Sequence, residues 1–254
     1  MSVSERDIVD LLFPYVRSVF GAKSRETPEF LGSGILLKDH EHLYLITATH
    51  VMDHFGGKEY PPFLDCENGL VAISGEEICS YTEDPIKRRD DRHDISIVKL
   101  SHETQNRLKP VQYIQTEKLD VVGSHDSQLG YYCIGIPAKK GDKSIDVNIK
   151  QISPEPYSLC ASESDIGTYD KLKVNNSTHL ALNFNLKKVF SKDNEMRTAP
   201  ALNGLSGSPI WGFRRKSSTE LQAVVVAILT EYHQKDIKAI LGTRVSEVFR
   251  GITL

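Results

Sequence analysis

Short runs of apolar residues, separated by clusters of polar turn residues, dominate the chain after Phe30. Runs of roughly 4–8 residues, rich in β-branched side chains and bounded by such clusters, are typical of strands. The runs are 34–37 (GILL), 43–49 (LYLITAT), 71–75 (VAISG), 94–100 (DISIVKL), 131–137 (YYCIGIP), 178–185 (THLALNFN), 208–213 (SPIWGF), 221–229 (LQAVVVAIL) and 238–245 (KAILGTRV). We therefore expect a mostly β protein with antiparallel connections.

Helical spacing is confined to the two ends of the chain. Apolar residues recur at intervals of three and four between Ile8 and Val16, which predicts a short helix over residues 8–20 that ends at Gly21. At the other end, residues 245–252 (VSEVFRGI) predict a closing helix. The expected long loops are 83–92, which is densely charged, and 139–146, which is polar.

The charge balance excludes some partners. Lys+Arg 31 against Asp+Glu 34 gives the 254-residue chain a formal net charge of −3, so no basic field would attract a nucleic-acid backbone. The longest apolar run, Ala223–Leu229, is far shorter than the ~20 residues of a membrane-spanning helix. We expect a globular protein with neither a nucleic-acid partner nor a membrane partner.

The first residues and the cysteines bear on location. Glu5, Arg6, Asp7 and Asp10 stand where a signal peptide would carry an unbroken apolar stretch. The four cysteines are scattered and form no CxxC pair. Both features favour a cytoplasmic protein whose thiols are reduced.

A serine between glycines precedes one of the predicted strands. In residues 203–209 (NGLSGSP), Ser206 is followed at once by the apolar run 208–213. Glycine permits the tight backbone in which neighbouring N–H groups point at one spot, as a hydrolase needs around its nucleophile. By itself, however, such a segment is more often a plain glycine-rich turn.

His50 and Asp94 stand at the ends of predicted strands. His50 follows the run 43–49, and the end of a buried strand holds a general base rigidly. Asp94 directly precedes residues 95–100, where its carboxylate can orient an imidazole and stabilise the imidazolium. Taken singly, each residue is more often structural, as a strand-end histidine or a turn aspartate.

The order of the three segments changes that interpretation, because histidine, aspartate and serine follow one another as in the chymotrypsin-type triad. The motifs also resemble those of trypsin-like serine peptidases. TATHV is similar to their TAAHC/TAAHV, DISIVKL to DIALLKL, GLSGSP to GDSGGP/GNSGGP, GSGILL to the strand before the histidine, and GIP to the GYP or GFP strand of the second barrel. With GTRV and the closing helix, the resemblance spans roughly residues 28–252.

The resemblance implies a chymotrypsin-like architecture of two packed, six-stranded antiparallel β-barrels with the active site in the cleft between them. The expected units are an N-terminal helical extension (1–27), a first barrel carrying His50 and Asp94 (28–120), and a second barrel carrying Ser206 together with the C-terminal helix (121–254).

It also implies a role for each site residue. Ser206 would be the nucleophile, His50 the general acid and base, and Asp94 the residue that orients His50. The backbone N–H groups of Gly204 and Ser206 would form the oxyanion hole. The chain is therefore expected to be a serine endopeptidase that cleaves a protein or peptide substrate through an acyl-enzyme, without a cofactor or metal.

Departures from the family pattern are informative. Val51 stands where secreted members have a disulfide-forming cysteine, which favours an intracellular, HtrA-like branch, and too few residues follow the expected second barrel for a PDZ domain. Leu205 replaces the aspartate of zymogen-activated members, so we expect a partner protein or a conformational trigger to regulate activity instead. Ser208 replaces the second glycine after the nucleophile, a change between small residues.

The residues before Ser206 bear on specificity. Relatives that cut after Lys or Arg have an aspartate six positions before the serine, and Pro200 holds that position here, followed by Ala201 and Leu202. Leu229 and Thr230 are expected to form the other pocket wall, where glutamate-specific relatives carry a histidine. A charged P1 side chain would be unpaired there, so we expect a small or medium apolar one. Arg197 and His233 lie near enough in sequence to leave an acidic P1 residue open.

Two other functions compete with this interpretation. Residues 50–54 (HVMDH) imitate the HxxEH zinc motif, but they follow a β run and meet Gly56 and Gly57 almost at once, whereas a zinc helix should be long. The other is a catalytically inactive trypsin-like scaffold that acts as a protein-binding module. The match at all three triad positions and at Gly204 favours the enzyme.

Overall fold

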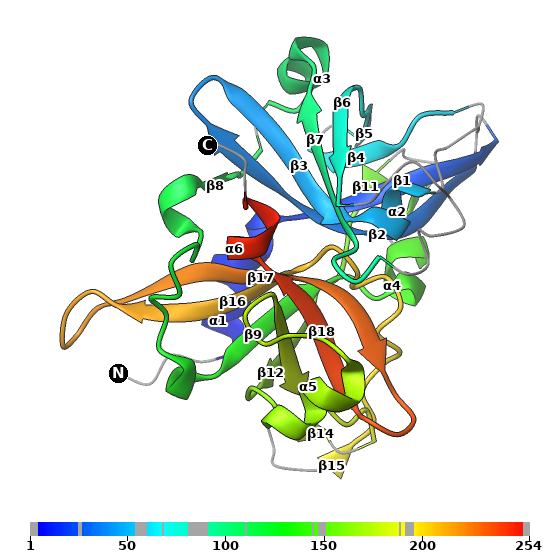
Figure 1. Ribbon diagram of the computed structural model, residues 1–254. Helices are drawn as coiled ribbons and strands as arrows, with labels where there is room; N and C mark the ends of the chain where they lie inside the picture. The colour runs from blue at the N-terminus through cyan, green and yellow to red at the C-terminus, as the bar shows by residue number, and fades with distance from the viewer. Residues whose placement is uncertain are drawn as a thin grey trace.

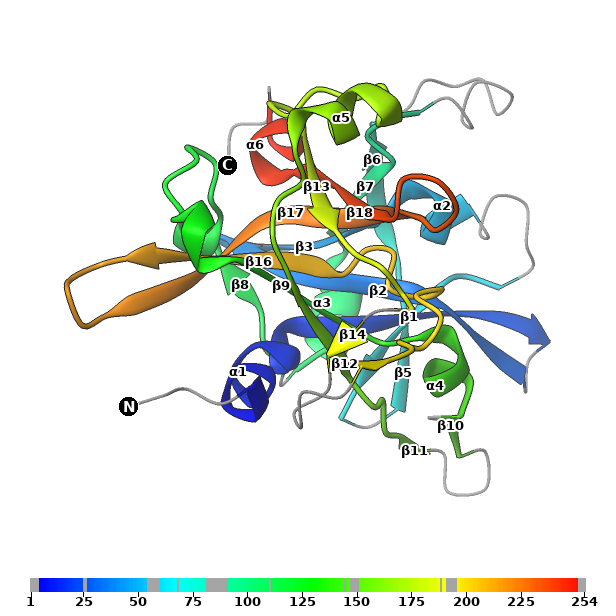
Figure 2. The ribbon, with the colours of Figure 1, turned by 90° about the horizontal axis from the view of Figure 1, so that it is seen from below.

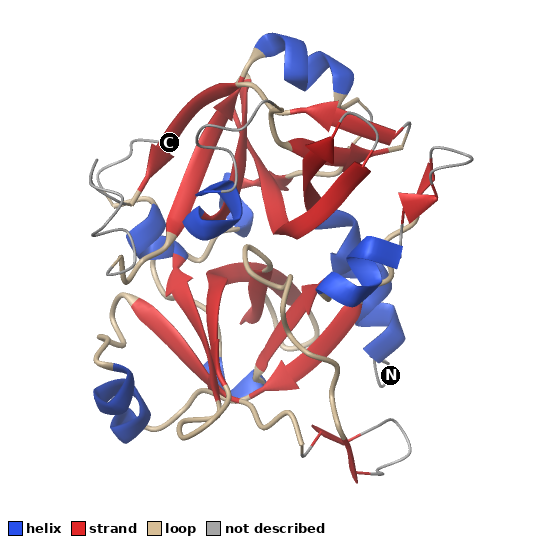
Figure 3. Cartoon of the chain, turned by 90° about the vertical axis from the view of Figure 1, so that its right-hand side faces the viewer, coloured by secondary structure: helices blue, strands red, loops and turns tan. Residues whose placement is uncertain are grey.

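Two curled β-sheets make up most of the structure, a computed structural model that describes residues 5–24, 27–53, 60–67, 69–80, 91–109, 111–143, 145–146, 151–187, 189–190 and 196–250. The first sheet, mostly blue to cyan in Figure 1, lies above the second, which runs from green to red. Figure 3 shows the strands of the two sheets as separate groups, one above the other. The mostly β fold with two barrel-like sheets is thus confirmed.

The first sheet follows the order β5-β4-β1-β2-β3-β7-β6 in the described residues, and β8 adds to β2 in parallel. It is therefore larger than the six strands that we expected. Its strands are β1 (Val16–Ser24), β2 (Thr27–Asp39), β3 (His42–Ala48), β4 (Phe63–Cys66), β5 (Gly69–Ala72), β6 (Gly75–Cys79), β7 (Ile95–Leu100) and β8 (Ile114–Gln115).

The second sheet has the order β12-β9-β16-β17-β18-β13, and its neighbouring strands pair antiparallel. Its strands are β9 (Tyr131–Gly135), β12 (Tyr157–Ala161), β13 (His179–Asn183), β16 (Pro209–Arg215), β17 (Leu221–His233) and β18 (Ala239–Arg244). Two small hairpins stand apart, β10 (Ile145–Asp146) with β11 (Gln151–Ile152) and β14 (Val189–Phe190) with β15 (Met196–Arg197).

The helices are short and lie outside the sheets. They are α1 (Glu5–Leu12), α2 (Thr49–Met52), α3 (His102–Arg107), α4 (Ala138–Lys143), α5 (Ile166–Leu172) and α6 (Val245–Val248). No helix in the described ranges is long and apolar enough to cross a bilayer. The expected closing helix begins at Val245 as α6 but ends at Val248. Phe249 and Arg250 form a turn, and residues 251–252 of that prediction lie outside the described residues.

Each predicted strand run contributes residues to a strand of the structure, although residues 71–75 are divided between β5 and β6. The prediction of one helix over residues 8–20 is wrong in its second half, because α1 ends at Leu12 and β1 begins at Val16. Pro14, which has no N–H to donate, lies in a single 3₁₀ turn between them. The chain then pairs with β2, and this tertiary pairing overrides the helical spacing.

Residues 5–24 contact both sheets. α1 lies beside the second sheet, as Figure 2 shows from below, and the Ser158 hydroxyl donates to Glu5 Oε1 at 2.7 Å. The strand that follows, β1, belongs to the first sheet.

One of the two expected long loops, 139–146, is mostly helical, and its last two residues form β10. Residues 138–143 form α4, whose Gly141 lies so close to Phe30 that a Cβ there would come within 2.3 Å of the ring. This contact gives the polar segment a packed face, which composition did not reveal. The other expected loop, 83–92, lies outside the described residues up to Asp90.

An apolar cluster between the two sheets sets their relative position. It combines Ile35, Leu37 and Ile46 of the first sheet with Trp211 and Val225 of the second. All five side chains are almost wholly buried, and burial of one such side chain contributes about 1.5–3 kcal/mol. Burial of this cluster therefore fixes the first sheet relative to the second.

The segment that connects the sheets is tied down by Asp120, whose side chain is fully buried. Its carboxylate accepts from the Ser124 N–H and hydroxyl, each at 2.7 Å, from Arg214 Nη2 at 3.2 Å, and from His125 Nδ1. A buried carboxylate needs such partners, since an unpaired charge there would be costly.

Candidate active site

The loop that carries Ser206 owes its shape to two glycines. Gly204 and Gly207 have φ angles of +94° and +85°, in the region that favours glycine. Between them Leu205 is wholly buried in the apolar core of the second sheet and anchors the loop there. Ser206 is thus presented on a tight turn directly before β16.

Both sheets form hydrogen bonds to the backbone of this loop. From the first sheet, the Ser33 N–H donates to the Ser206 carbonyl at 2.9 Å, and the Ser33 hydroxyl donates to the Gly204 carbonyl at 3.2 Å. From the second sheet, the Leu229 carbonyl accepts from the Gly207 N–H at 2.8 Å. Ser206 therefore lies where the two sheets meet.

Asp94 grips the turn that carries His50. Its backbone carbonyl accepts from the Thr49 N–H at 2.9 Å, and its Oδ1 accepts from the His50 N–H at 3.0 Å. Its Oδ2 lies 2.6 Å from His50 Nδ1. The carboxylate fixes the tautomer, because Nδ1 must carry the proton that it donates and Nε2 is then left as an acceptor. The His50 side chain is 48% exposed and the Asp94 side chain 15%.

The His50 turn and the Ser206 loop pack on the same glycine. A Cβ on Gly32 would lie 2.6 Å from Val51 Cγ2 and 3.0 Å from the Ser206 carbonyl oxygen. Within the described residues, the Ser206 hydroxyl donates to the Thr230 carbonyl at 3.4 Å and not to His50. The structure thus brings His50 and Asp94 into direct contact and places the Ser206 loop beside their turn. A hydrogen bond between a catalytic serine and histidine often tightens only when substrate binds.

The backbone N–H groups of the Ser206 loop differ in their hydrogen bonding. In the described part of the chain, those of Gly204 and Ser206 donate no hydrogen bond, whereas those of Leu205, Gly207 and Ser208 do. A side chain on Gly204 would not fit, since its Cβ would come within 2.6 Å of the Ala138 nitrogen. The N–H groups of Gly204 and Ser206 are the two that the family resemblance assigns to an oxyanion hole.

Carboxylates around His50 control its protonation. Burial lowers the pKa of His50, but the hydrogen bond and charge of Asp94 and the charges of Asp53 and Glu231 outweigh burial, so the pKa is raised above 6.5. The pKa of Glu231 is itself lowered, first by its hydrogen bond with His233 and against the effect of burial. Glu231 Oε2 lies 2.8 Å from His233 Nε2.

The expected pocket residues differ in their surroundings. Ala201 is exposed and Pro200 half-buried, while Leu202 and Leu229 belong to the core of the second sheet. The Thr230 side chain is also buried, and its hydroxyl donates to the Leu241 carbonyl at 3.4 Å. Leu202, Leu229 and Thr230 are therefore packed inside the sheet, and only Pro200 and Ala201 of the expected pocket residues have appreciable exposed surface.

Sequence reasoning missed several residues near the site. Glu231, which influences the pKa of His50, carries no motif signal. Ser33 and Thr47 were quoted only as parts of GSGILL and TATHV, yet their atoms contact the Ser206 loop. The zinc alternative receives little support, because α2 is only four residues long; His54 lies outside the described residues.

No protein-family model matches the chain, and no curated protein matches it either. Solved structures match it over nearly its whole length. The structure of GrC is 16% identical, with a TM-score of 0.54, and the match covers 94% of this chain and 91% of that one.

Two further matches are to named proteases. The Drosophila Grass clip serine protease of the Toll pathway is 17% identical, with a TM-score of 0.58, over 94% of this chain and 67% of that one. The serine endoprotease from Yersinia pestis is 14% identical, with a TM-score of 0.52, over 98% of this chain and 65% of that one. Identities this low establish the fold alone, and the fold of this chain is the chymotrypsin fold found in trypsin-like serine proteases.

Proposed function

We propose that this protein is a serine endopeptidase in which Ser206 is the nucleophile, His50 the general base and Asp94 the residue that orients His50. The observation that carries the proposal is the pair of hydrogen bonds that the Asp94 carboxylate accepts from His50. Oδ1 lies 3.0 Å from the backbone nitrogen and Oδ2 lies 2.6 Å from Nδ1. The Ser206 loop, held by both sheets beside that turn, supports the same assignment.

The proposed reaction uses these groups in turn. The Ser206 hydroxyl rotates from Thr230 toward His50, and Nε2 takes its proton as Oγ attacks the carbonyl carbon of the substrate. The N–H groups of Gly204 and Ser206 donate to the resulting oxyanion, and each such donor is worth ~3 kcal/mol of transition-state stabilisation. The His50 imidazolium then protonates the leaving amine. Water, deprotonated by the same imidazole, hydrolyses the acyl-enzyme and restores Ser206.

The proposal includes a small or medium apolar P1 residue. Its support is the sequence, which has no charged residue at positions 200–202 and 229–230; Leu202 and Leu229 are buried in the core, and Pro200 is half-buried. His233 is an unsuitable partner for an acidic P1 side chain because it is already paired with Glu231. A peptide-library digest read by mass spectrometry tests this part, and a dominant Lys, Arg, Asp or Glu at P1 would refute it.

Regulation by a partner or a conformational trigger is also part of the proposal. Leu205 is buried in the core, so no charged group at that position is available for the ion pair that activates zymogens. The Ser206 hydroxyl bonded to Thr230 supports a resting state that a trigger could convert. Equal activity of the purified protein with and without cell lysate would count against regulation of this kind.

The test of the function is hydrolysis of an unfolded protein substrate by the wild type and by Ser206→Ala. We expect turnover by the wild type and a loss of several orders of magnitude in the variant. Ser127→Ala, which removes an exposed hydroxyl elsewhere, serves as the matched control and should keep full activity. No turnover by the wild type, with or without lysate, would favour the binding-module alternative.

A further inference from the structure

The segment that precedes Asp94 is held by the opposite sheet. We call residues 91–94 the Asp94 strap. His179 Nε2, from β13, lies 2.8 Å from the carbonyl oxygen of Arg92. The Thr243 hydroxyl, from β18, donates to the carbonyl oxygen of His93 at 2.6 Å. Two consecutive carbonyls of the strap are therefore bound by side chains of the second sheet, although Asp94 leads into a strand of the first.

The two side chains that bind the strap form one unit. His179 and Thr243 are direct partners across the β13–β18 pair. Both residues are almost wholly buried, at 2% and 1% exposed, whereas Arg92 is exposed and His93 half-buried, so the two hydrogen bonds are partly buried. The His179 ring also stacks on His93, with ring centroids 5.3 Å apart and an interplanar angle of 16°.

Local contacts fix the tautomer of His179. A carbonyl oxygen only accepts, so Nε2 must carry the proton that is donated to Arg92. Nδ1 is then an acceptor, and it lies 2.8 Å from the Thr178 hydroxyl, whose single hydrogen also has the Asn175 carbonyl within reach at 3.1 Å. The Arg92 carbonyl thus sets His179 as a donor to the strap.

The conformation of Asp94 needs this support. Its φ of +50° lies in the left-handed region that non-glycine residues rarely adopt, and such strain persists only where the surroundings fix it. Contacts from its own sheet hold the strap through Asp91, whose carboxylate accepts from the His93 N–H at 3.0 Å and from the Ser80 hydroxyl at 2.6 Å. The Arg92 and His93 carbonyls depend on His179 and Thr243 instead.

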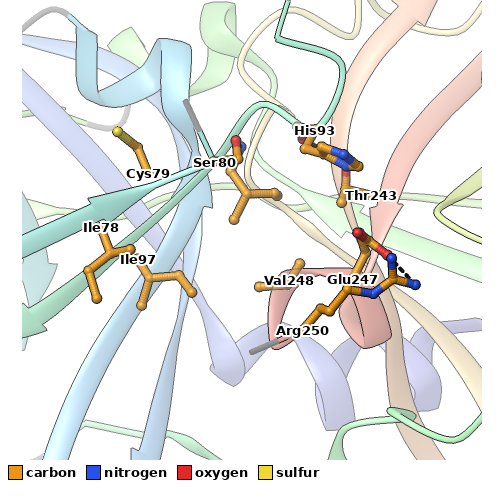
Figure 4. Close-up of a pocket in the computed structure, with 10 residues that line it drawn as sticks. Ile78, Cys79, Ser80, His93, Ile97, Thr243, Glu247, Val248 and Arg250 are labelled. Atoms are coloured by element: carbon orange, nitrogen blue, oxygen red, sulfur yellow. Dashed lines mark hydrogen bonds and ion pairs between the residues drawn. The ribbon is translucent and has the colours of Figure 1, made fainter. Parts of the chain in front are cut away.

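Packing does not replace these hydrogen bonds on one side of the strap. His93 and Thr243 lie on the wall of a cavity of about 230 Å³, and Figure 4 shows them side by side, apart from the apolar side chains of Ile78 and Ile97. On this side His93 borders an open pocket rather than packed side chains.

The same sheet also holds the Ser206 loop. β17 lies next to β18, and the Leu229 and Thr230 carbonyls of β17 accept from the Gly207 N–H and the Ser206 hydroxyl. We infer that His179 and Thr243 are positioning residues. They hold Asp94, and through it the His50 ring, in a fixed position relative to the Ser206 loop. This inference rests on the proposed function of His50, Asp94 and Ser206.

Variants at the two positions test the inference by kinetics. His179→Met removes the donor but keeps an unbranched side chain of similar size, and Thr243→Val removes only the hydroxyl. We expect each to lower kcat by roughly 10- to 100-fold with KM little changed, since a misplacement of about 1 Å costs on the order of 10²-fold. His179→Gln and Thr243→Ser, which keep a donor at the same reach, should retain most of the activity.

Two readouts report on Asp94 and His50 themselves. In His179→Met the pKa of His50 should fall, because its bond to Asp94 is loosened, and the acidic limb of the kcat/KM profile should move to lower pH. The downfield ¹H NMR resonance of the His50 Nδ1–H should move upfield or broaden, and this readout requires no activity. Tyr169→Phe is the control: its hydroxyl donates to Glu163 at 2.6 Å and accepts from the Ala181 N–H of β13 at 3.1 Å, so the variant disturbs the same strand without touching the strap.

The possible outcomes separate the inference from the proposed function. Wild-type kcat and an unshifted pH limb in both His179→Met and Thr243→Val would overturn the inference, as would an equal loss in Tyr169→Phe. If His179→Met does not fold, comparison of kcat between Thr243→Val and Thr243→Ser tests the inference. If the wild type itself has no activity, the proposed function fails, and an unchanged His50 resonance in the variants would still refute the positioning role.

Discussion

Replacement of Gly207 by alanine is expected to damage both stability and the site. Gly207 has a φ of +85°, and a Cβ there would lie 1.9 Å from the Ser33 carbonyl oxygen and 2.3 Å from Thr47 Oγ1. The contacts are with a backbone carbonyl and with a hydroxyl that itself donates to Ser33 at 2.6 Å, so neither can yield cheaply. The loop that carries Ser206 must therefore move away from the first sheet.

The magnitude has two parts. The left-handed backbone costs a residue with a Cβ about 1–2 kcal/mol, and insertion of a methyl group into a packed site typically costs about 1–3 kcal/mol more. Gly207→Ala should therefore lower the free energy of unfolding by about 2–5 kcal/mol. It should also reduce peptidase activity beyond that loss, because the displaced loop carries the nucleophile.

Gly123 provides a matched control for the backbone part alone. Its φ is +69°, but a Cβ there would meet no atom within 4 Å. Gly123→Ala should cost only the ~1–2 kcal/mol of the left-handed backbone and leave activity intact. Urea denaturation of the two variants measures the difference. Equal destabilisation by both, or full activity in Gly207→Ala, would refute the contact between the Ser206 loop and the first sheet.

Three further predictions follow from the site and from the connection between the sheets. Asp94→Asn should lower kcat by roughly 10⁴-fold, because an amide favours the wrong tautomer of His50, and a mild effect in steady-state assays would contradict the assignment. Glu231→Gln should move the acidic limb of the kcat/KM profile to lower pH. His50 must be neutral to act as the base, and the charge of Glu231 helps to raise its pKa above 6.5, so loss of that charge lowers the pKa. An unmoved limb would be evidence against an effect of Glu231 on His50. Asp120→Asn should cost about 3–5 kcal/mol in urea denaturation near neutral pH. Burial raises the pKa of Asp120, but hydrogen bonds from His125 and Ser124 outweigh burial and lower it. The greater stability of the wild type is therefore present above the pKa of about 4 in the unfolded chain and is lost as pH falls through the folded pKa. A stability difference that does not fall in acid would contradict this role of Asp120.

The strands could be predicted from sequence because their signals are local. Runs such as 221–229 and 95–100 are apolar, β-branched and bounded by turn residues, and they lie in β17 and β7. The N-terminal helix was overextended, because spacing from Ile8 to Val16 was given more weight than Pro14. The helical nature of residues 138–143 depends on a contact with Phe30, far away in sequence.

The site was predictable only where motifs exist. His50 and Asp94 were found because their segments match motifs of one family in the right order, and the structure joins them by hydrogen bonds. His179 and Glu231 lie in ordinary strand patterns, and their significance comes from partners supplied by the fold, such as the carbonyl of Arg92. Single-sequence patterns contain no information about such pairs, because long-range contacts decide them.

The measurement that tests the central claim most directly is the labelling of Ser206 by a fluorophosphonate, located by peptide mass spectrometry. The reagent forms an ester with an activated serine oxygen and releases fluoride, so it reports the nucleophile without any knowledge of the natural substrate. We predict a single adduct on Ser206 in the wild type, none in Ser206→Ala, and labelling at least ~10²-fold slower in His50→Ala. No adduct in the wild type with or without lysate, an adduct on another residue, or equal rates in the wild type and His50→Ala would contradict the claim that His50 activates Ser206.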